Sequence, residues 1–364
     1  MASAAGSSLT NMSVVVPVFS LAGAASAAWA AHTVLARHNG DIRDWAIRFL
    51  TGPGRTSRLL LLLFMALNLK SLPFVWTARI FGAMIRHTLW PRKPLPQQSL
   101  FHYSITRSRT SLMETDYNFH KSNSTYFADL DASRTHLVMY LLGPGVAAVG
   151  RNQATKIVVS PDDGVTPMKG SLGVGLGAVF CSFRKEIAPY QPYEMWSRVL
   201  SWDRKWLYVM THFVVKGKVK PSSWDGDKTG RPKKEWTAAD EANLQKHVIA
   251  TAISKYVFKL GRFTVHPTFL MESSSLLPTR PGEGWRGGGP EAVGAVGDFD
   301  EAEISESTTP STDSESDGEA WTWKDVERER RRGMALAGQF AALDDAGALF
   351  NGGKNGALGI FGPG

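Results

Sequence analysis

Residues 114–126 read Glu-Thr-Asp-Tyr-Asn-Phe-His-Lys-Ser-Asn-Ser-Thr-Tyr, and they lead into a long helical pattern. Either Ser122 or Asn123 offers a side-chain oxygen that can cap the start of a helix. The apolar residues that follow recur at helical spacing, at Tyr126, Leu130, Leu137 and Leu141. The Gly143-Pro144-Gly145 stretch is predicted to end this helix.

Strand-like runs lie on both sides of the helix. The predicted strands cover residues 101–111, 173–183, 193–202, 206–215 and 252–265. A basic insertion at residues 216–235 and a short helix capped by Thr237 precede the last of them. One helix with a run of antiparallel strands predicts an α+β domain in which the sheet wraps around the helix.

The first residues of the quoted stretch carry two carboxylates, Glu114 and Asp116, just ahead of the helix start. Hydrolysis of a thioester needs a carboxylate that activates water or attacks the carbonyl carbon. It also needs hydrogen-bond donors for the oxyanion, and the unpaired N–H groups at a helix start are such donors. The stretch offers both parts.

The spacing resembles a known signature. From Glu114 the pattern runs two residues to an Asp, four to a His, three to an Asn and three to a Tyr, with Arg134 further down the helix. It resembles hotdog-fold thioesterases of the 4-hydroxybenzoyl-CoA type, in which Asp-x-Asp precedes Gly-His-Val-Asn-Asn and a Tyr on the central helix. The arrangement is most similar to the branch of animal thioesterase superfamily member six and its fungal thioesterase-like relatives. The runs at residues 68–74 and 201–206 are similar to the fungal group.

The resemblance implies a hotdog domain that hydrolyses an acyl thioester carried by CoA or a carrier protein. It also implies a homodimer with the active site at the subunit interface, and no metal or redox cofactor. Position by position, Asp116 matches the catalytic base or nucleophile, Glu114 the first acid, and Asn123 the helix-start N–H that polarises the carbonyl.

His120, Tyr126 and Phe119 match positions that bind substrate. The sequence departs from the family pattern twice: Glu114 stands where Asp is usual, and Phe119 where Gly is usual. Other interpretations remain open. Asp116 can cap a turn, His120 can serve as a hydrogen-bonding residue, Tyr126 can belong to the core, and Glu114 can form an ion pair with Arg134.

The N-terminal third, residues 1–95, is expected to contact a membrane. Residues 12–35 contain no Lys, Arg, Asp or Glu, with Arg37 just beyond them, and are long enough to span a bilayer, which takes about 20 residues. Basic residues then punctuate an apolar stretch at Arg58, Lys70, Arg79 and Arg86, a pattern typical of a helix lying in the membrane interface. Residues 37–109 hold twelve Lys or Arg and two acids.

If residues 12–35 span the membrane, these charges place the domain on the cytosolic side, with the endoplasmic reticulum as one candidate membrane. The alternative is a pair of helices packed on the domain.

The remaining chain divides by composition into a hotdog domain at 96–277, an acidic linker expected to be disordered at 278–320, and a tail at 321–364 that contains a possible helix. The single cysteine, Cys181, excludes an intrachain disulfide. No zinc-finger or RNA-binding motif is present, so nucleic acid is not an expected partner.

Two rival functions stay open. Hotdog hydratases carry Asp-x-Asn-Pro-x-His, with the His five residues after the Asp, whereas His120 lies four after Asp116 and the Pro is absent. A membrane-tethered hotdog protein that binds acyl groups or scaffolds a partner without catalysis is kept open by Glu114 and Phe119. The glycines of residues 173–177 lie in a strand pattern with no helix after them, so they indicate a curved strand and not a dinucleotide loop.

Overall fold

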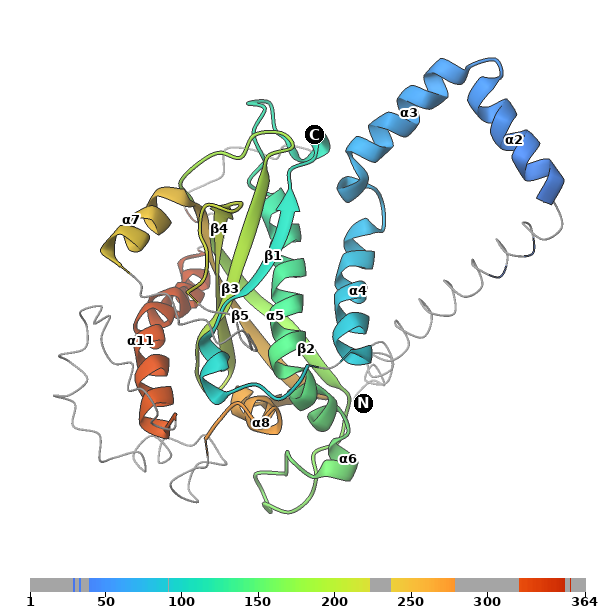
Figure 1. Cartoon of the computed structure of the whole chain (residues 1–364). Helices are drawn as coiled ribbons and strands as arrows, with labels where there is room; N and C mark the ends of the chain where they lie inside the picture. Colours follow the sequence, from blue (N-terminus) through green and yellow to red (C-terminus); the bar gives the residue numbers. More distant parts are fainter. Residues whose placement is uncertain are drawn as a thin grey trace.

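A curved antiparallel sheet wraps around one long helix, α5 (Thr125–Gly150), as the sequence predicts (Figure 1). The computed structural model describes residues 39–90, 92–222, 237–278 and 321–350, with Trp29, Thr33 and Lys354. The strands, in spatial order, are β1 (Ser104–Arg109), β3 (Pro192–Trp202), β4 (Trp206–Val215), β5 (Val248–Leu260) and β2 (Leu172–Phe183), with β6 (Phe263–Val265) beside β5. The predicted last strand is therefore two strands, which meet at Gly261, where φ is 61°.

A layer of buried hydroxyl groups lies between two apolar clusters along α5. The Ser133 side chain accepts from Thr106 at 2.9 Å and bonds Ser197 at 2.8 Å, and Ser197 bonds Thr211 at 2.7 Å. One cluster gathers around Leu137 and the other around Leu130. The hydroxyl groups satisfy one another, so the polar layer avoids the cost of unpaired buried groups.

The helix continues through Gly143-Pro144-Gly145, and the prediction that this stretch ends it is wrong. Pro144 lacks the N–H that would bond the Tyr140 carbonyl. The guanidinium of Arg92 donates to that carbonyl at 2.8 Å instead, and the Gly145 N–H donates to the Ser274 hydroxyl at 2.9 Å. Side chains from outside the helix thus replace the missing internal bonds.

The glycine-rich strand β2 bends where the sequence indicates. Its register shifts between Leu176 and Ala178, and a Cβ at Gly177 would lie 2.4 Å from the ring of Trp206. A side chain at this position would displace the indole, so glycine allows the strand and the ring to approach.

Helix α11 (Trp323–Ala341), in the C-terminal tail, packs on the face of the sheet opposite α5 (Figure 1). Ala337 and Phe340 pack against Leu200 and Tyr208 of the strands. Gly333 allows close contact, because a Cβ there would lie 1.9 Å from the Leu200 carbonyl oxygen. The other short elements are η2 (Gln97–Phe101), η3 (Leu112–Glu114), α6 (Asn152–Thr155), α7 (Ala238–His247), α8 (Pro267–Ser273) and η5 (Ala342–Leu349).

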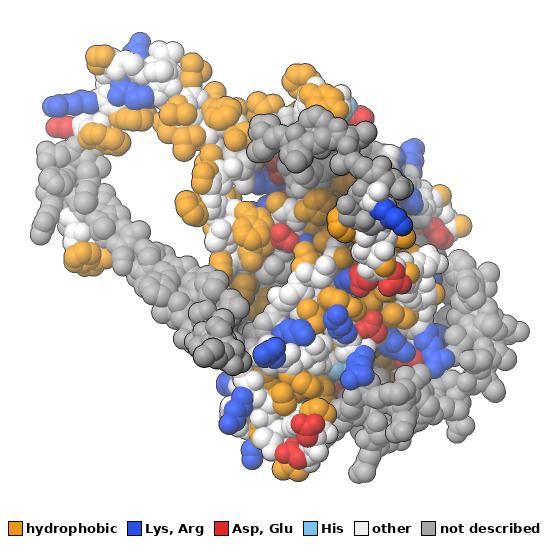
Figure 2. All heavy atoms as spheres, turned by 180° about the vertical axis from the view of Figure 1, so that it is seen from behind, with side chains coloured by type: hydrophobic (Ala, Val, Ile, Leu, Met, Phe, Trp, Pro, Cys, Tyr) orange, Lys and Arg blue, Asp and Glu red, His pale blue; other side chains and the backbone are white. Residues whose placement is uncertain are grey.

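Within residues 39–90, three α-helices precede the sheet, and they differ in how they contact the body of the domain. They are α2 (Asn39–Thr51), α3 (Arg55–Leu67) and α4 (Val75–Leu89), with the short turn η1 (Leu69–Ser71) ahead of α4. α4 lies along α5, whereas α2 and α3 project from the body (Figure 1). Figure 2 shows hydrophobic side chains gathered over α2 and α3.

Among the described residues, no helix is long and apolar enough to cross a membrane. The span predicted at 12–35 lies outside the described residues apart from Trp29 and Thr33, and the predicted linker lies outside them apart from its first residue.

Candidate active site

Residues 114–122 form a narrow hairpin, here called the motif hairpin, directly ahead of α5. Thr115 and Lys121 face each other across it, and the Asp116 N–H donates to the His120 carbonyl at 2.9 Å. At its base the Ser122 N–H donates to the Glu114 carbonyl at 2.8 Å. The motif that the sequence singles out is therefore one compact unit.

Asp116 lies at the tip of the motif hairpin and is partly exposed to solvent. Its Oδ1 accepts the Asn118 N–H at 2.9 Å, so the side chain caps the turn. No described residue bonds its Oδ2. His120, also at the tip, places Nε2 2.9 Å from a carboxylate oxygen of the exposed Glu186.

Phe119 occupies the left-handed backbone region, with φ at 60°, and 72% of its surface is exposed. This conformation is unfavourable for a residue with a Cβ and easy for glycine. The geometry gives a physical reason for the glycine that is usual at this position in the signature that the sequence resembles. In this chain the tip instead presents an aromatic ring to solvent.

Glu114 is buried at the base of the motif hairpin, away from the tip. Its Oε2 accepts the Ser111 N–H at 2.9 Å, and its Oε1 lies 3.1 Å from Lys121 Nζ and 2.9 Å from Lys70 Nζ. Both oxygens are therefore engaged within the protein. The alternative in which Glu114 pairs with Arg134 is wrong: Glu114 pairs with Lys70 and Lys121, and Arg134 pairs with Asp131 at 2.6 Å.

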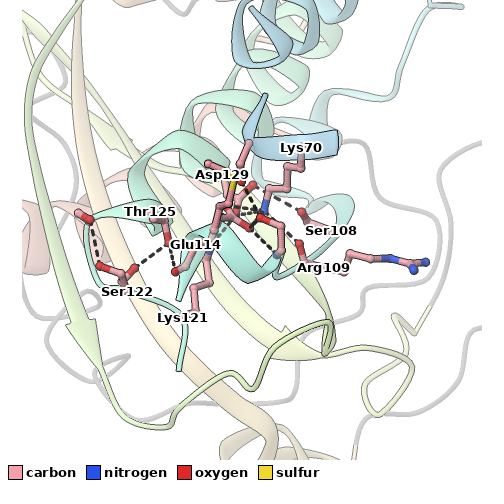
Figure 3. A network of polar contacts seen from close by, with 12 residues as sticks. Lys70, Ser108, Arg109, Glu114, Lys121, Ser122, Thr125 and Asp129 are labelled. Carbon is pink, nitrogen blue, oxygen red and sulfur yellow. Dashed lines mark hydrogen bonds and ion pairs between the residues drawn. The ribbon is translucent and has the colours of Figure 1, made fainter. Parts of the chain in front are cut away.

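Asp129 of α5 is the centre of the same charge network, and sequence reasoning missed it (Figure 3). Its side chain is fully buried, and its carboxylate lies 2.7 Å from Lys70, 3.0 Å from Lys121 and 2.9 Å from Arg79. The Tyr193 hydroxyl also donates to it. Three cations and a phenol thus surround one carboxylate.

The charges decide how Asp129 titrates. Burial alone raises its pKa, but Lys121, Lys70 and Arg79 outweigh burial and hold the pKa of Asp129 well below its ordinary value. Burial lowers the pKa of Lys70, against the attraction of Asp129. One signal could have revealed the site: Asp129 lies three residues after Tyr126, on the apolar face of the helix, and a buried acid needs cationic partners.

Asn123 is exposed immediately ahead of α5, whose N-cap is Ser124. The Thr125 N–H donates a hydrogen bond to the Ser122 carbonyl at 3.0 Å. Within the described chain, the N–H groups of Asn123 and Ser124 donate to no protein acceptor. Among the described residues, these two N–H groups are therefore available as hydrogen-bond donors at the start of α5.

Tyr126, the second residue of α5, is 2% exposed and packs edge-on against Phe183 and Phe213. Lys121 Nζ lies 5.3 Å above its ring, and burial raises the pKa of the phenol. The structure therefore places Tyr126 in the core beside the charge network. Its role toward substrate, like the roles of the other five predicted site residues, remains a prediction.

Comparisons with known proteins agree on one family. The family model of the thioesterase-like superfamily matches residues 110–238, which include the motif hairpin. Probable thioesterase atnL of Emericella nidulans is 32% identical over 323 residues, 86% of this chain and 92% of that protein. Thioesterase poxG of Penicillium oxalicum is 34% identical over 286 residues, 76% of this chain and 81% of that protein. A probable thioesterase of Saccharomyces cerevisiae is 32% identical over 231 residues, 60% of this chain and 80% of that protein. The chain therefore belongs to the hotdog-fold thioesterase-like superfamily.

Proposed function

We propose that this protein hydrolyses an acyl thioester carried by CoA or a carrier protein, with Asp116 as its base or nucleophile. The observation that carries the proposal is the contrast between the two acids of the motif. Glu114 is buried and bonded to two lysines, whereas Asp116 is accessible and keeps one oxygen without a described partner. Membership of a family whose relatives are named thioesterases supports the reaction class.

The chemistry follows from these groups. Asp116 removes a proton from water while the water oxygen attacks the carbonyl carbon of the thioester. The N–H groups at Asn123 and Ser124 donate to the oxyanion that develops. Collapse of this intermediate expels the thiolate and leaves the carboxylic acid. In the nucleophilic version, the Asp116 carboxylate attacks the carbonyl carbon, the C–S bond breaks and the thiolate leaves, and water then hydrolyses the anhydride to the carboxylic acid and free Asp116.

Thiol release from a panel of acyl-CoA thioesters, measured with the full-length chain, tests the proposal. Asp116→Asn is expected to lower the rate by about a hundredfold or more, the contribution of a positioned base. Asp162→Asn, an exposed acid on a distant loop, is the matched control and should retain the rate. Equal rates in all three proteins would remove Asp116 from the mechanism.

A non-catalytic alternative is favoured by one contact. The Asn118 N–H to Asp116 bond gives the carboxylate a structural use, and Phe119 crowds the tip where glycine would leave space. A membrane-tethered protein that binds acyl groups or scaffolds a partner fits both features. It predicts acyl binding without thiol release, and binding that survives Asp116→Asn.

We also propose that two copies pair through β2, which is an edge strand of the sheet. Val174, Leu176 and Phe180 on this strand are each almost half exposed. The outer edge of an edge strand has backbone groups without strand partners, and exposed apolar residues beside it favour pairing with another strand. Leu176→Lys should reduce the mass measured by light scattering from that of a dimer to that of a monomer, and an unchanged mass would exclude this interface.

We further propose that the protein works at the cytosolic face of a membrane, with the endoplasmic reticulum as a candidate. The exposed apolar surface of α3 and the basic excess of residues 37–109 support contact with an anionic membrane surface. Flotation of the full-length chain with vesicles tests the contact.

A further inference from the structure

From Leu59 to its end at Leu67, helix α3 is apolar on every side, and no described part of the protein covers it. All thirteen of its residues are described and none is buried, with Leu60 60% exposed, Leu61 57% and Leu63 54%. A helix on the surface of a soluble domain keeps one polar face, whereas a helix apolar all round is surrounded by protein or lipid. At about 1.5 Å per residue, thirteen residues reach about 20 Å, too short to cross a bilayer of about 30 Å. The helix therefore suits the lipid interface.

The charges and aromatic residues around α3 select a lipid surface as its occupant. Arg48 and Arg55 are exposed on either side of the turn between α2 and α3. Trp45 of α2 is 64% exposed and stacks on Phe49, with ring centroids 5.2 Å apart. Exposed arginines suit anionic head groups, and tryptophan is enriched at the depth of the head groups.

The end of α3 is fastened to the residues that lead into the motif hairpin. Asn68, the residue after α3, is fully buried and accepts the Met113 N–H at 2.9 Å. Ser71 and Ser111 share a hydrogen bond of 2.6 Å, and Lys70 reaches Glu114. The depth of α3 in a membrane therefore fixes how far the motif hairpin lies from that membrane.

The motif hairpin and the turn before it add their own apolar surface beside Asp116. Met113 is 55% exposed, Tyr117 90% and Phe119 72%. The Met113 N–H donates to Asn68, the residue after α3, so this surface lies next to the end of the apolar helix. Figure 2 shows further hydrophobic side chains on the part of the body next to α3. An acyl chain moving from the lipid to Asp116 would stay against apolar surface.

We infer that the substrate is an acyl thioester long enough to partition into the bilayer, and that it reaches Asp116 along the surface formed by α3, Met113, Tyr117 and Phe119. The inference rests on the proposed hydrolysis. The chain tail remains in lipid or against these residues while the thioester meets the carboxylate. Each additional methylene group multiplies the partition coefficient from water into lipid by about four, so long acyl chains enter the bilayer far more than short ones.

The test compares two substrates with full-length protein and vesicles of phosphatidylcholine and phosphatidylserine at about four to one. Thiol release is measured from palmitoyl-CoA carried in the vesicles and from butyryl-CoA in solution, and the ratio of the two rates is the readout. The variant Leu60→Asp/Leu63→Asp places charge on one side of α3. Val165→Asp/Leu349→Asp is the matched control, because these residues are 76% and 83% exposed on distant segments.

The variant should lower the ratio by at least about tenfold, because each leucine transferred to lipid contributes roughly that factor, and the control should not. Flotation of the variant with the vesicles should fall in parallel. An unchanged ratio overturns the inference, whether the variant still floats, has lost flotation, or has changed from dimer to monomer. Hydrolysis of neither substrate by the parent chain instead overturns the proposed function, and the inference falls with it.

Discussion

The base and the tip of the motif hairpin lie a few residues apart and have opposite character. At the base, Glu114 and Lys121 are buried and face opposite charges from other elements. At the tip, Asp116 and Phe119 face solvent, and the bonds of Asp116 are to neighbours in the same turn. The difference teaches that one short motif can hold a buried ion network at its base and present accessible groups at its tip, where the proposed reaction would take place.

The largest effect on stability is expected from removing the negative charge of Asp129, the α5 residue that the base of the motif hairpin contacts. Asp129→Asn leaves Lys70, Lys121 and Arg79 without their shared counter-charge and should lower the free energy of unfolding by about 3 to 5 kcal/mol. Denaturant unfolding of the full-length chain measures the loss. Asp162→Asn should stay within about 0.5 kcal/mol of the parent. A loss below about 1 kcal/mol for Asp129→Asn would show that the network does not stabilise the fold.

The same carboxylate should make the fold sensitive to acid. The folded-state pKa of Asp129 is depressed, so its stabilisation is complete above its unfolded pKa of about 3.9 and is lost as pH falls below that value. Unfolding followed from neutral to acidic pH should show a steeper decline for the parent than for Asp129→Asn. Parallel curves would contradict the assignment.

Glu114→Gln sharpens the comparison, because it changes the base while keeping the size of the side chain. Loss of the charge that faces Lys70 and Lys121 should cost roughly 1 to 3 kcal/mol of unfolding free energy. Thiol release per folded molecule should fall far less than in Asp116→Asn. An equal fall in turnover would return Glu114 to the catalytic set.

The smallest change in the free energy of unfolding is expected at the tip of the motif hairpin. Phe119→Gly relieves the left-handed backbone and should raise the free energy of unfolding by about 0.5 to 1 kcal/mol, after the larger unfolded-state entropy of glycine is offset. Tyr117→Gly, an exposed aromatic residue at the same tip for which no positive φ occurs, is the matched control and should not stabilise the protein. Stabilisation by both variants would point to relief of exposed aromatic surface and not of backbone strain.

Local patterns made most of the fold predictable. Period-two alternation located the strands because the sheet buries one face against α5, and helical spacing located α5 itself. The predicted end of α5 failed because the groups that compensate for Pro144 come from Arg92 and Ser274, at separations of 48 and 129 residues from their partners. Such partners leave no local signal.

The candidate site also combines residues that local sequence patterns predict with residues that come from distant parts of the chain. The motif hairpin and the helix start are contiguous in sequence, so spacing identified them. Lys70 and Tyr193 meet Asp129 from 59 and 64 residues away, and a lysine in an apolar stretch predicts a membrane contact. The structure corrects this interpretation for Lys70: the residue lies in η1, after α3, and its ammonium group bonds Glu114, Asp129 and Tyr193 inside the domain.

Lys70 has a practical consequence for anyone who shortens this chain to make it easier to purify. A protein that begins at residue 96, where composition changes, lacks Lys70, Arg79 and Asn68, and with them two of the three cations around Asp129. Arg92, which supports the interrupted turn of α5, is lost as well. A shortened protein that keeps the interior intact has to start before Asn68, so detergent-free purification calls for polar substitutions on α3 in place of its removal.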